Sequence, residues 1–314
     1  MTEPGLVARA VAGDESAFAQ LVAEYRRPVF RHCYRMLGSG GDAEDATQDT
    51  LEKAWRGLGG YDGVGTFGAW LHRIATNVCL DAHRARRTRP GLVTVEPISD
   101  DVLLDPTDPQ DELVRREEVS LAFVAALQRL APRQRAALLL HDVLGFTHAE
   151  VAEVLDIGPT AVNSLLSRAR ESVRVNAGKP QPSISDPRVR QLLGRYLRAW
   201  QLADVNALVG LVTEDVNFAM PPGTLAFAGR VATLEFIETA IFGPARPHGV
   251  AVRAGSCNGQ FAVGTYQPDE NGALVIGGIQ VLRLAMVDGS PLITEITSYR
   301  DPELAIRCGM PATY

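Results

Sequence analysis

The segment from Thr147 to Arg174 restricts the fold of this chain most, because its pattern admits two short helices across a tight turn. Thr147 and Glu150 have the spacing of a capping box, which begins a helix. Gly158 and Pro159 then favour a turn and the first position of a second helix. The second helix has an apolar face made of Val162, Leu165, Leu166, Ala169 and Val173. This pattern predicts a helix-turn-helix, whose second helix fits the major groove of DNA.

The opposite face of the second helix carries the candidate base contacts. These residues are Asn163, Ser164, Ser167 and Arg168. Arg168 is the best candidate for a bidentate contact to guanine. A generic surface helix of an all-α domain is the alternative interpretation. The chain has a formal net charge of -6 and a pI near 5.6, whereas a protein that coats nucleic acid is basic, so a further partner must bring this helix to DNA.

The negative charge is concentrated in one segment. Residues 91–130 contain 9 acidic and 3 basic residues, and the run VEPISDDVLLDPTDPQDE is rich in Asp and Pro. This composition indicates a linker, and NAGKPQPSISDP indicates a second one. We therefore predict a helical domain at 1–90, an acidic linker at 91–115, the helix-turn-helix domain at 116–177, a linker at 178–187 and a further domain at 188–314.

Before the acidic linker, the apolar spacing predicts three helices. Gly38 has the position of a C-terminal cap of the first, and Asp42 is expected to cap the start of the second. The second helix then exposes an acidic face, made of Glu44, Asp45, Gln48, Asp49 and Glu52. Simple solvation is the alternative interpretation of such a face. The third helix ends in Arg84, Arg86, Arg87 and Arg89, more cations than a helix dipole needs, which favours phosphate contacts.

Three blocks carry a resemblance to a known family. DAEDATQDTLEKAW, FGAWLHRIATNVCLDAHRARR and LAPRQRAALLLHDVLGFTHAEVAEVLDIGPTAVNSLLSRARESV occur in this order. They resemble regions 2 and 4 of the bacterial sigma-70 family, in its extracytoplasmic-function (ECF) group. The resemblance implies two all-α sigma domains, a region 2 helical bundle and a region 4 helix-turn-helix. It also implies an RNA polymerase sigma factor that directs core polymerase to promoters, a non-enzymatic role.

The resemblance also implies partners and residue roles. Region 2 of the family binds the clamp helices of the polymerase β′ subunit and opens the −10 element, whereas region 4 binds the β flap and reads the −35 element. The residues expected to bind core polymerase are Asp45, Gln48, Asp49 and Glu52. Those expected at the −10 DNA are Asn77, Arg84, Arg86 and Arg87. Many relatives have a basic residue where Asn163 stands, so their −35 preference does not transfer.

Residues 188–314 form an additional domain that a minimal sigma factor does not have. A helical pattern is followed by runs rich in Val, Ile, Thr and Tyr, with turn signals at Asn271-Gly272 and Asp288-Gly289. This order resembles the SnoaL-like, or NTF2-like, α+β cone. Its candidate pocket residues are Asp215, His248, Arg283, Glu295 and Tyr299. Because no acid and base are paired in the sequence, we expect regulation of the sigma domains by this tail, and a purely stabilising or dimerising tail is the alternative.

The cysteine spacing, the apolar runs and the first residues of the chain indicate which cofactors and which cellular compartment to expect. The four cysteines have no CxxC or zinc-ligand spacing, so no metal or cofactor is expected. No apolar run has the length of a membrane span, and the first residues do not resemble a signal peptide, so we expect a cytoplasmic protein. A small-molecule ligand or an anti-sigma protein is a further expected partner. The alternative functions are a free-standing helix-turn-helix regulator and an NTF2-like cyclase or hydrolase with a DNA-binding appendage.

Overall fold

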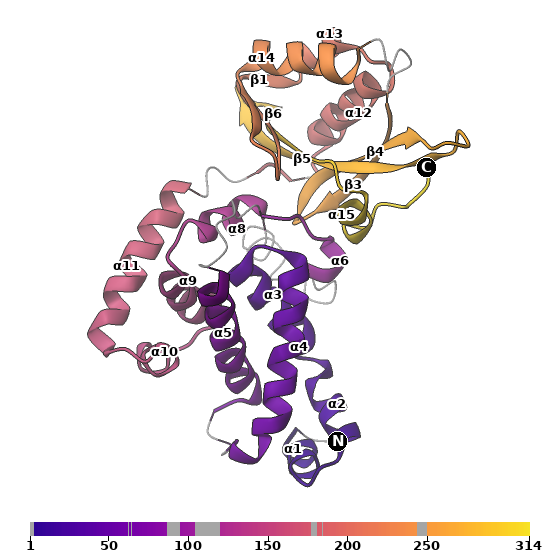
Figure 1. Ribbon diagram of the computed structural model, residues 1–314. Coiled ribbons are helices and arrows are strands. Elements are labelled where there is room, and N and C mark those ends of the chain that lie inside the picture. The colour runs from indigo at the N-terminus through magenta and orange to yellow at the C-terminus, as the bar shows by residue number, and fades with distance from the viewer. Residues whose placement is uncertain are drawn as a thin grey trace. The chain divides into compact units, whose positions relative to one another are not determined.

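The structure is a computed structural model that describes residues 3–61, 63, 65–86, 95–103, 120–176, 181–183, 185–243 and 250–314. The chain forms two compact units, and Figure 1 labels most of their helices and strands. The first unit combines Met1–Glu96 with Ala122–Gly178, and the second combines Pro97–Leu121 with Lys179–Tyr314. None of the described helices is long and apolar enough to cross a membrane.

The first unit is all-α in its described residues, as the sequence predicts. Its N-terminal helices are α1 (Glu3–Val11), α2 (Glu15–Ala23), α3 (Arg26–Leu37), α4 (Gly40–Gly57) and α5 (Phe67–Arg86), with a 3-10 turn, η1 (Leu58–Gly60). Its C-terminal helices are α8 (Leu121–Gln128), α9 (Pro132–Leu138), the π-helical turn η2 (Leu139–Val143), α10 (His148–Leu155) and α11 (Pro159–Asn176).

Helix α3 ends at the predicted residue, but α4 begins earlier than predicted. Gly38 adopts a left-handed conformation with φ of 77° and caps α3. The prediction that Asp42 caps α4 is wrong, because Ser39 is the N-cap and its Oγ accepts a hydrogen bond from the Asp42 N–H at 3.4 Å. Glu96, 56 residues further along the chain, accepts a second bond from the Gly40 N–H at 3.1 Å. Its carboxylate stabilises the positive end of the α4 dipole.

Two buried histidines join α3 to α5. His32 Nε2 lies 2.9 Å from Thr76 Oγ1, and the Thr76 hydroxyl donates to the His72 carbonyl at 2.8 Å. The two imidazole rings meet edge to face, with centroids 5.5 Å apart. Because burial removes water from both rings, the pKa of each histidine is lowered below its usual value of 6.5. Both rings are therefore neutral in the folded protein.

A buried arginine holds the C-terminal helices of the first unit against the N-terminal ones. The Arg135 side chain of α9 is nearly inaccessible, with 2% of its surface exposed. Its Nε donates to the Leu127 carbonyl at 2.8 Å, and its Nη2 donates to the carbonyls of Gln128 and Leu130 at 3.2 Å. Its Nη1 donates to the Met36 carbonyl at the end of α3. Helix α9 consequently packs against both α3 and α5 (Figure 1).

The second unit has the α+β architecture that the sequence predicts. Its strands are β1 (Val212–Met220), β2 (Leu225–Ala228), β3 (Ala251–Cys257), β4 (Gln260–Pro268), β5 (Leu274–Val287) and β6 (Ser290–Tyr299). They form one sheet in the order β2-β1-β6-β5-β4-β3, in which only β1 and β6 pair in parallel among the described strands. Its helical elements are α6 (Asp100–Leu103), α12 (Pro187–Gln201), α13 (Val205–Val209), α14 (Arg230–Phe236), η3 (Ile237–Ile241) and α15 (Pro302–Arg307).

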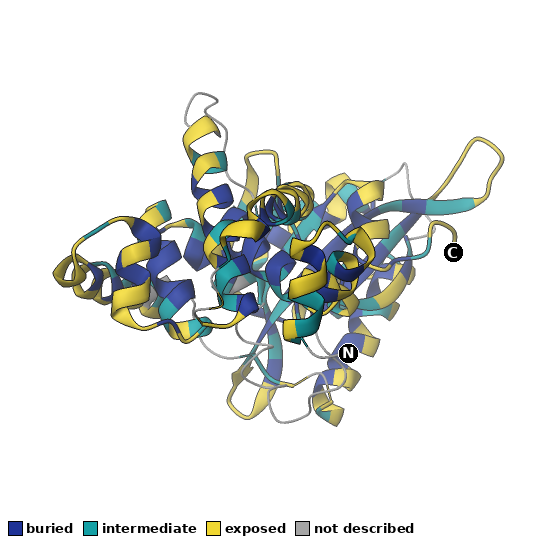
Figure 2. Cartoon of the chain, turned by 90° about the horizontal axis from the view of Figure 1, so that it is seen from below, coloured by how far each residue is buried: buried dark blue, intermediate teal, exposed yellow. Residues whose placement is uncertain are grey.

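The sheet buries both of its faces. One apolar cluster joins α12, α13 and α14 to the sheet, and a second joins α15 to β3, β4, β5 and β6. Neighbouring residues of β5 alternate between them, so that Leu282 belongs to the first cluster and Val281 to the second. Figure 2 shows that the helices are buried on one side and exposed on the other.

The neutral histidines predict that the first unit loses stability in acid. Unfolding restores a pKa near 6.5 to His32 and His72, so the unfolded chain gains protons as the pH falls below that value, and stability falls with it. At pH 5.5 each histidine should cost up to about 1.4 kcal/mol. Urea unfolding of Trp200→Phe, whose remaining tryptophans are Trp55 and Trp70, reports on this unit. Equal stability at pH 7.5 and 5.5 would contradict the prediction, and His32→Gln/His72→Gln should reduce the pH dependence.

Candidate nucleic-acid interface

The predicted helix-turn-helix is formed by α10 and α11. Thr147 Oγ1 accepts a hydrogen bond from the Glu150 N–H at 3.3 Å, and Glu150 Oε2 accepts from the Thr147 N–H at 2.7 Å, which completes the capping box. The Thr147 hydroxyl also donates to Glu150 Oε2 at 2.7 Å, and this bond, together with the one from the Thr147 N–H, lowers the pKa of Glu150. Asp156 then adopts a left-handed conformation with φ of 50°, and α11 begins at Pro159 as predicted. The tight turn fixes the direction of α11 relative to α10.

The predicted apolar face of α11 faces the core of the first unit. Val162, Leu166 and Ala169 are buried, whereas Leu165 and Val173 are partly buried. The residues expected to contact bases are all exposed, namely Asn163, Ser164, Ser167 and Arg168. Their exposure leaves this face of α11 accessible to a DNA groove.

The arginines of α11 differ in their partners. Arg170 binds Asp142 of η2 through two hydrogen bonds of 2.6 and 2.9 Å, which raise the pKa of Arg170. Arg174 pairs with Glu171 at 2.8 Å. Arg168 has no ion pair with any residue that the structure describes. Its guanidinium is therefore available for an external acceptor, such as a guanine edge.

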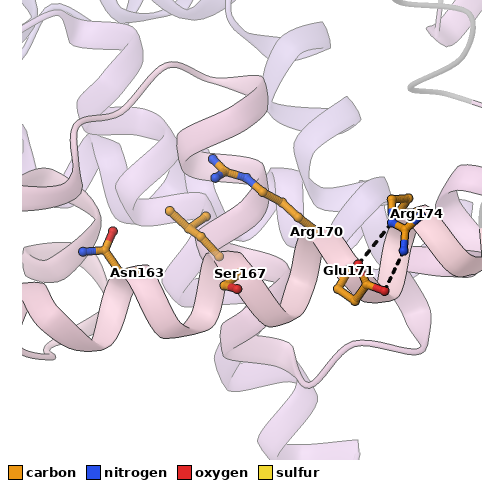
Figure 3. A pocket seen from close by; sticks show the side chains of 6 residues that line it. Asn163, Ser167, Arg170, Glu171 and Arg174 are labelled. Carbon is orange, nitrogen blue, oxygen red and sulfur yellow. Dashed lines mark hydrogen bonds and ion pairs between the residues drawn. The ribbon is translucent and has the colours of Figure 1, made fainter.

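A shallow hollow runs along α11 beside these residues. It is lined by Asn163, Leu166, Ser167, Arg170, Glu171 and Arg174. Figure 3 shows Asn163 and Ser167 along one side of the helix and the paired Glu171 and Arg174 further along it. The hollow is open to solvent and mixes amide, hydroxyl and charged groups.

The predicted acidic face lies on α4. Its members Glu44, Asp45, Gln48, Asp49 and Glu52 are all exposed. Glu44 pairs with Arg26 and Glu52 pairs with Arg56. Asp45 and Asp49 have no ion pair within the described part of the chain. Their carboxylates are available to a basic partner.

The residues expected near the −10 DNA lie on α5 and beyond it. Asn77 is exposed, and exposed Arg84 pairs with Asp81 at 2.5 Å. Arg86 is the last residue of α5, and nothing is described of its side chain, while Arg87 lies outside the described residues. Trp70 is only partly buried and lies seven residues before Asn77, on the same face of α5.

The candidate pocket residues of the second unit do not share one environment. Asp215 is exposed on β1, and Tyr299 is buried in the second apolar cluster. Arg283 and Glu295 are half-buried and lie opposite each other in the register of β5 and β6. His248 lies outside the described residues.

Pattern reasoning missed a polar cluster in the same unit, around Asn258 and Gln260 at the turn between β3 and β4. Both side chains are buried and bind residues of the predicted acidic linker region or its flank. The Asn258-Gly259 pair was the available signal, because this dipeptide favours a tight hairpin turn.

Comparisons with known proteins agree with these features. The family models of sigma-70 region 2 and sigma-70 region 4 match residues 21–89 and 120–173. The chain is 42% identical over 248 residues to the ECF RNA polymerase sigma factor SigG of Mycobacterium tuberculosis, which covers 72% of this chain and 66% of SigG. It is 34% identical over 167 residues to SigM of the same species, which covers 52% of this chain and 79% of SigM.

A solved structure matches nearly the whole chain. The crystal structure of the Mycobacterium tuberculosis ECF sigma factor SigJ has a TM-score of 0.63 and 25% identity, and the match covers 90% of this chain and 96% of that one. The similarity therefore includes both units. The chain belongs to the ECF group of sigma-70 factors, with regions 2 and 4 in its first unit and a C-terminal domain built on a six-stranded mixed sheet in its second.

Proposed function

We propose that this chain is a promoter-specificity subunit of RNA polymerase, which brings core polymerase to promoters and starts transcription. The observation that carries the proposal is the exposed polar face of α11, where Arg168 has no ion pair among the described residues, in a chain of net charge -6. An acidic protein binds DNA weakly by charge alone, so its recognition helix needs a carrier. Core polymerase is that carrier in this proposal, and the acidic face of α4 is its docking surface.

Region 4 reads the −35 element through α11 in this proposal. Arg168 donates to a guanine edge, while Asn163, Ser164 and Ser167 contact neighbouring bases or phosphates. Region 2 reads the −10 element through the exposed side of α5. There the Asn77 amide bonds an extruded base, and Arg84, Arg86 and Arg87 contact phosphates.

Arg168→Ala should relax the base preference at the −35 element while core binding survives. The side chain has no described ion pair to lose, so the free energy of unfolding should change by less than about 0.5 kcal/mol. Loss of a bidentate base contact costs about 1 to 3 kcal/mol, or roughly 5- to 150-fold in discrimination. Transcription by core polymerase and the full chain from a library of −35 sequences measures this. Arg174→Ala, on the same helix but paired with Glu171, is the matched control and should keep the preference.

Asp45→Lys/Asp49→Lys should weaken binding to core polymerase by at least about tenfold. The two substitutions replace unpaired carboxylates with cations on the surface proposed to meet a basic partner, and charge reversal at an interface is repulsive. The loss should shrink as salt rises, because salt screens exposed charges. Glu235→Lys/Glu238→Lys, with the same charge change on exposed positions of the C-terminal domain, is the control. Equal core affinity of both double variants would remove α4 from the docking surface.

We also propose that the C-terminal domain regulates the sigma regions. The support is the grouping of Pro97–Leu121, which connects region 2 to region 4, with the C-terminal domain. A ligand or an anti-sigma protein that changes this contact would change the activity of the sigma regions. A purely stabilising domain is the competing account, and it predicts no change in the activity of a folded chain without it.

Run-off transcription on the chain's own upstream DNA tests both proposals. The full chain and a version that ends after Gly178 should both initiate with core polymerase, and the shorter chain should initiate more. Equal initiation by the two would favour a stabilising domain. Specific binding of the DNA without polymerase, and no initiation with it, would favour a free-standing helix-turn-helix regulator.

A further inference from the structure

The turn between β3 and β4 binds the chain segment that follows region 2. The Ile98 N–H donates to Asn258 Oδ1 at 2.7 Å, and the Ile98 carbonyl accepts from the Asn258 N–H at 3.1 Å. One residue of the turn therefore satisfies both backbone groups of one residue of the segment. As in a sheet, both backbone groups of the bound residue are paired, but here one partner is the Asn258 side chain and the other its backbone N–H.

The neighbouring residues extend this contact. Ser99 forms an antiparallel β-bridge with Cys257, and the Gly259 N–H donates to Asp100 Oδ1 at 2.6 Å. The Cys308 thiol, after α15, donates to the carbonyl of Pro97 at 3.3 Å. Four consecutive residues of the segment are thus bound by the C-terminal domain.

The same turn also holds the far end of the connection. Gln260 Oε1 accepts a hydrogen bond from the N–H of Leu121, the first residue of α8, at 2.9 Å. Leu121 also packs against the second apolar cluster of the domain. Asp100 and Leu121 are therefore bound to two consecutive residues, Gly259 of the turn and Gln260, the first residue of β4.

These contacts are buried. Asn258 is fully buried, and 6% of the Gln260 surface is exposed. On the segment, Ile98 and Leu103 are buried as well. Both amides therefore lie out of water while the segment is docked, and each has a hydrogen-bond partner on the segment.

We propose that the β3–β4 turn, centred on Asn258, is a docking site for the chain's own connection between regions 2 and 4, and that docking shortens this connection until it is released. The inference rests on the proposed sigma function and states how the C-terminal domain regulates it. The docked segment is the inhibitory state, and a chain bound to both promoter elements has released it.

The length of the connection between regions 2 and 4 explains why docking would be inhibitory. The 34 residues between Arg86 and Leu121 can extend over about 110 Å. With Asp100 and Leu121 held on adjacent residues, the connection can span at most the length of the 13 residues between Arg86 and Asp100, about 45 Å, and this limit requires Glu96 to leave α4. Promoter elements at −10 and −35 are separated by about two and a half turns of DNA, or roughly 85 Å. Docking therefore reduces the maximum length of the connection between regions 2 and 4 by more than half.

Asn258→Gly is the variant that tests the docking site. Asn258 has a left-handed conformation with φ of 53°, which glycine adopts readily, so the substitution removes the amide and keeps the turn. Asp288→Gly is the matched control, because Asp288 has φ of 47° in the turn between β5 and β6 and is exposed. Asp100→Ala removes a second contact from the side of the segment and should act like Asn258→Gly.

Hydrogen exchange of the full chain measures docking directly. Peptides that contain Ile98 and Leu121 should be protected in the wild type and in Asp288→Gly, and should exchange at least about fivefold faster in Asn258→Gly. Peptides from β5 and β6 should stay protected in every variant, which separates release from unfolding. Absence of protection at Ile98 in the wild type would overturn the proposal.

Binding to core polymerase measures the consequence. Asn258→Gly and Asp100→Ala should each bind core polymerase, and initiate transcription, at least about fivefold better than the wild type and Asp288→Gly. When the wild type binds core polymerase, alkylation of the buried Cys308 should accelerate, because the segment that covers its thiol leaves. Cys33 and Cys79, both buried in region 2, are internal references.

The outcomes separate this inference from the proposed function. Normal initiation by all chains, with no gain in Asn258→Gly despite release of Ile98, would overturn the inference and leave the sigma function intact. Protection at Ile98 with no core binding by any variant would overturn the sigma function, and with it the regulatory meaning of the docking site.

Discussion

The buried Arg135 guanidinium is the interaction on which the arrangement of the sigma regions depends. A cation without a carboxylate partner is costly in a protein interior. Burial lowers the pKa of Arg135 to about 10. The cost is offset by backbone carbonyls at the ends of α8 and α3, where the helix dipoles are negative. His83 of α5, whose pKa is also lowered by burial, lies 2.9 Å from the same guanidinium and stays neutral beside it. One side chain thus joins helices from both regions.

The position of α9 determines where the recognition elements lie. Helix α11 packs on α9, and Arg170 ties α11 to η2. Helix α10 in turn approaches α5, where Glu153 and Arg73 are 3.5 Å apart. Arg73 precedes Asn77 by one helical turn. In this compact unit, region 4 therefore lies beside the α5 surface proposed to read the −10 element, and in the proposed mechanism the two regions separate when both bind DNA.

Local sequence signals predicted the elements whose stabilising contacts are local. The capping box of Thr147 and Glu150, the Pro159 start of α11 and the Gly38 end of α3 all depend on residues within a few positions of each other. The error at Asp42 has the opposite cause. The start of α4 is decided partly by Glu96, which no window around α4 contains.

Two further features that the sequence patterns do not indicate are buried polar contacts between distant parts of the chain. Arg135 lies in an apparently ordinary helix start, and nothing in the local pattern distinguishes a buried arginine from an exposed one. The Asp-rich run after Glu96 indicates a linker by composition, yet Pro97–Leu103 is ordered by a turn 160 residues away. Composition measures how much apolar surface a segment can bury, and it does not count backbone groups that another domain can satisfy.

In the proposed mechanism, two sets of contacts therefore oppose the change to the state in which both sigma regions bind DNA. Arg135 holds regions 2 and 4 together, and Asn258 holds the segment that joins them, so a state in which both regions bind DNA has to break both. The apparent affinity for polymerase is the intrinsic affinity reduced by the fraction of chains in the released state. A ligand of the C-terminal domain can change that affinity only if it binds the docked and released forms unequally. Binding of such a ligand would consequently have to alter the β3–β4 turn or its surroundings, whichever surface of the domain it occupied.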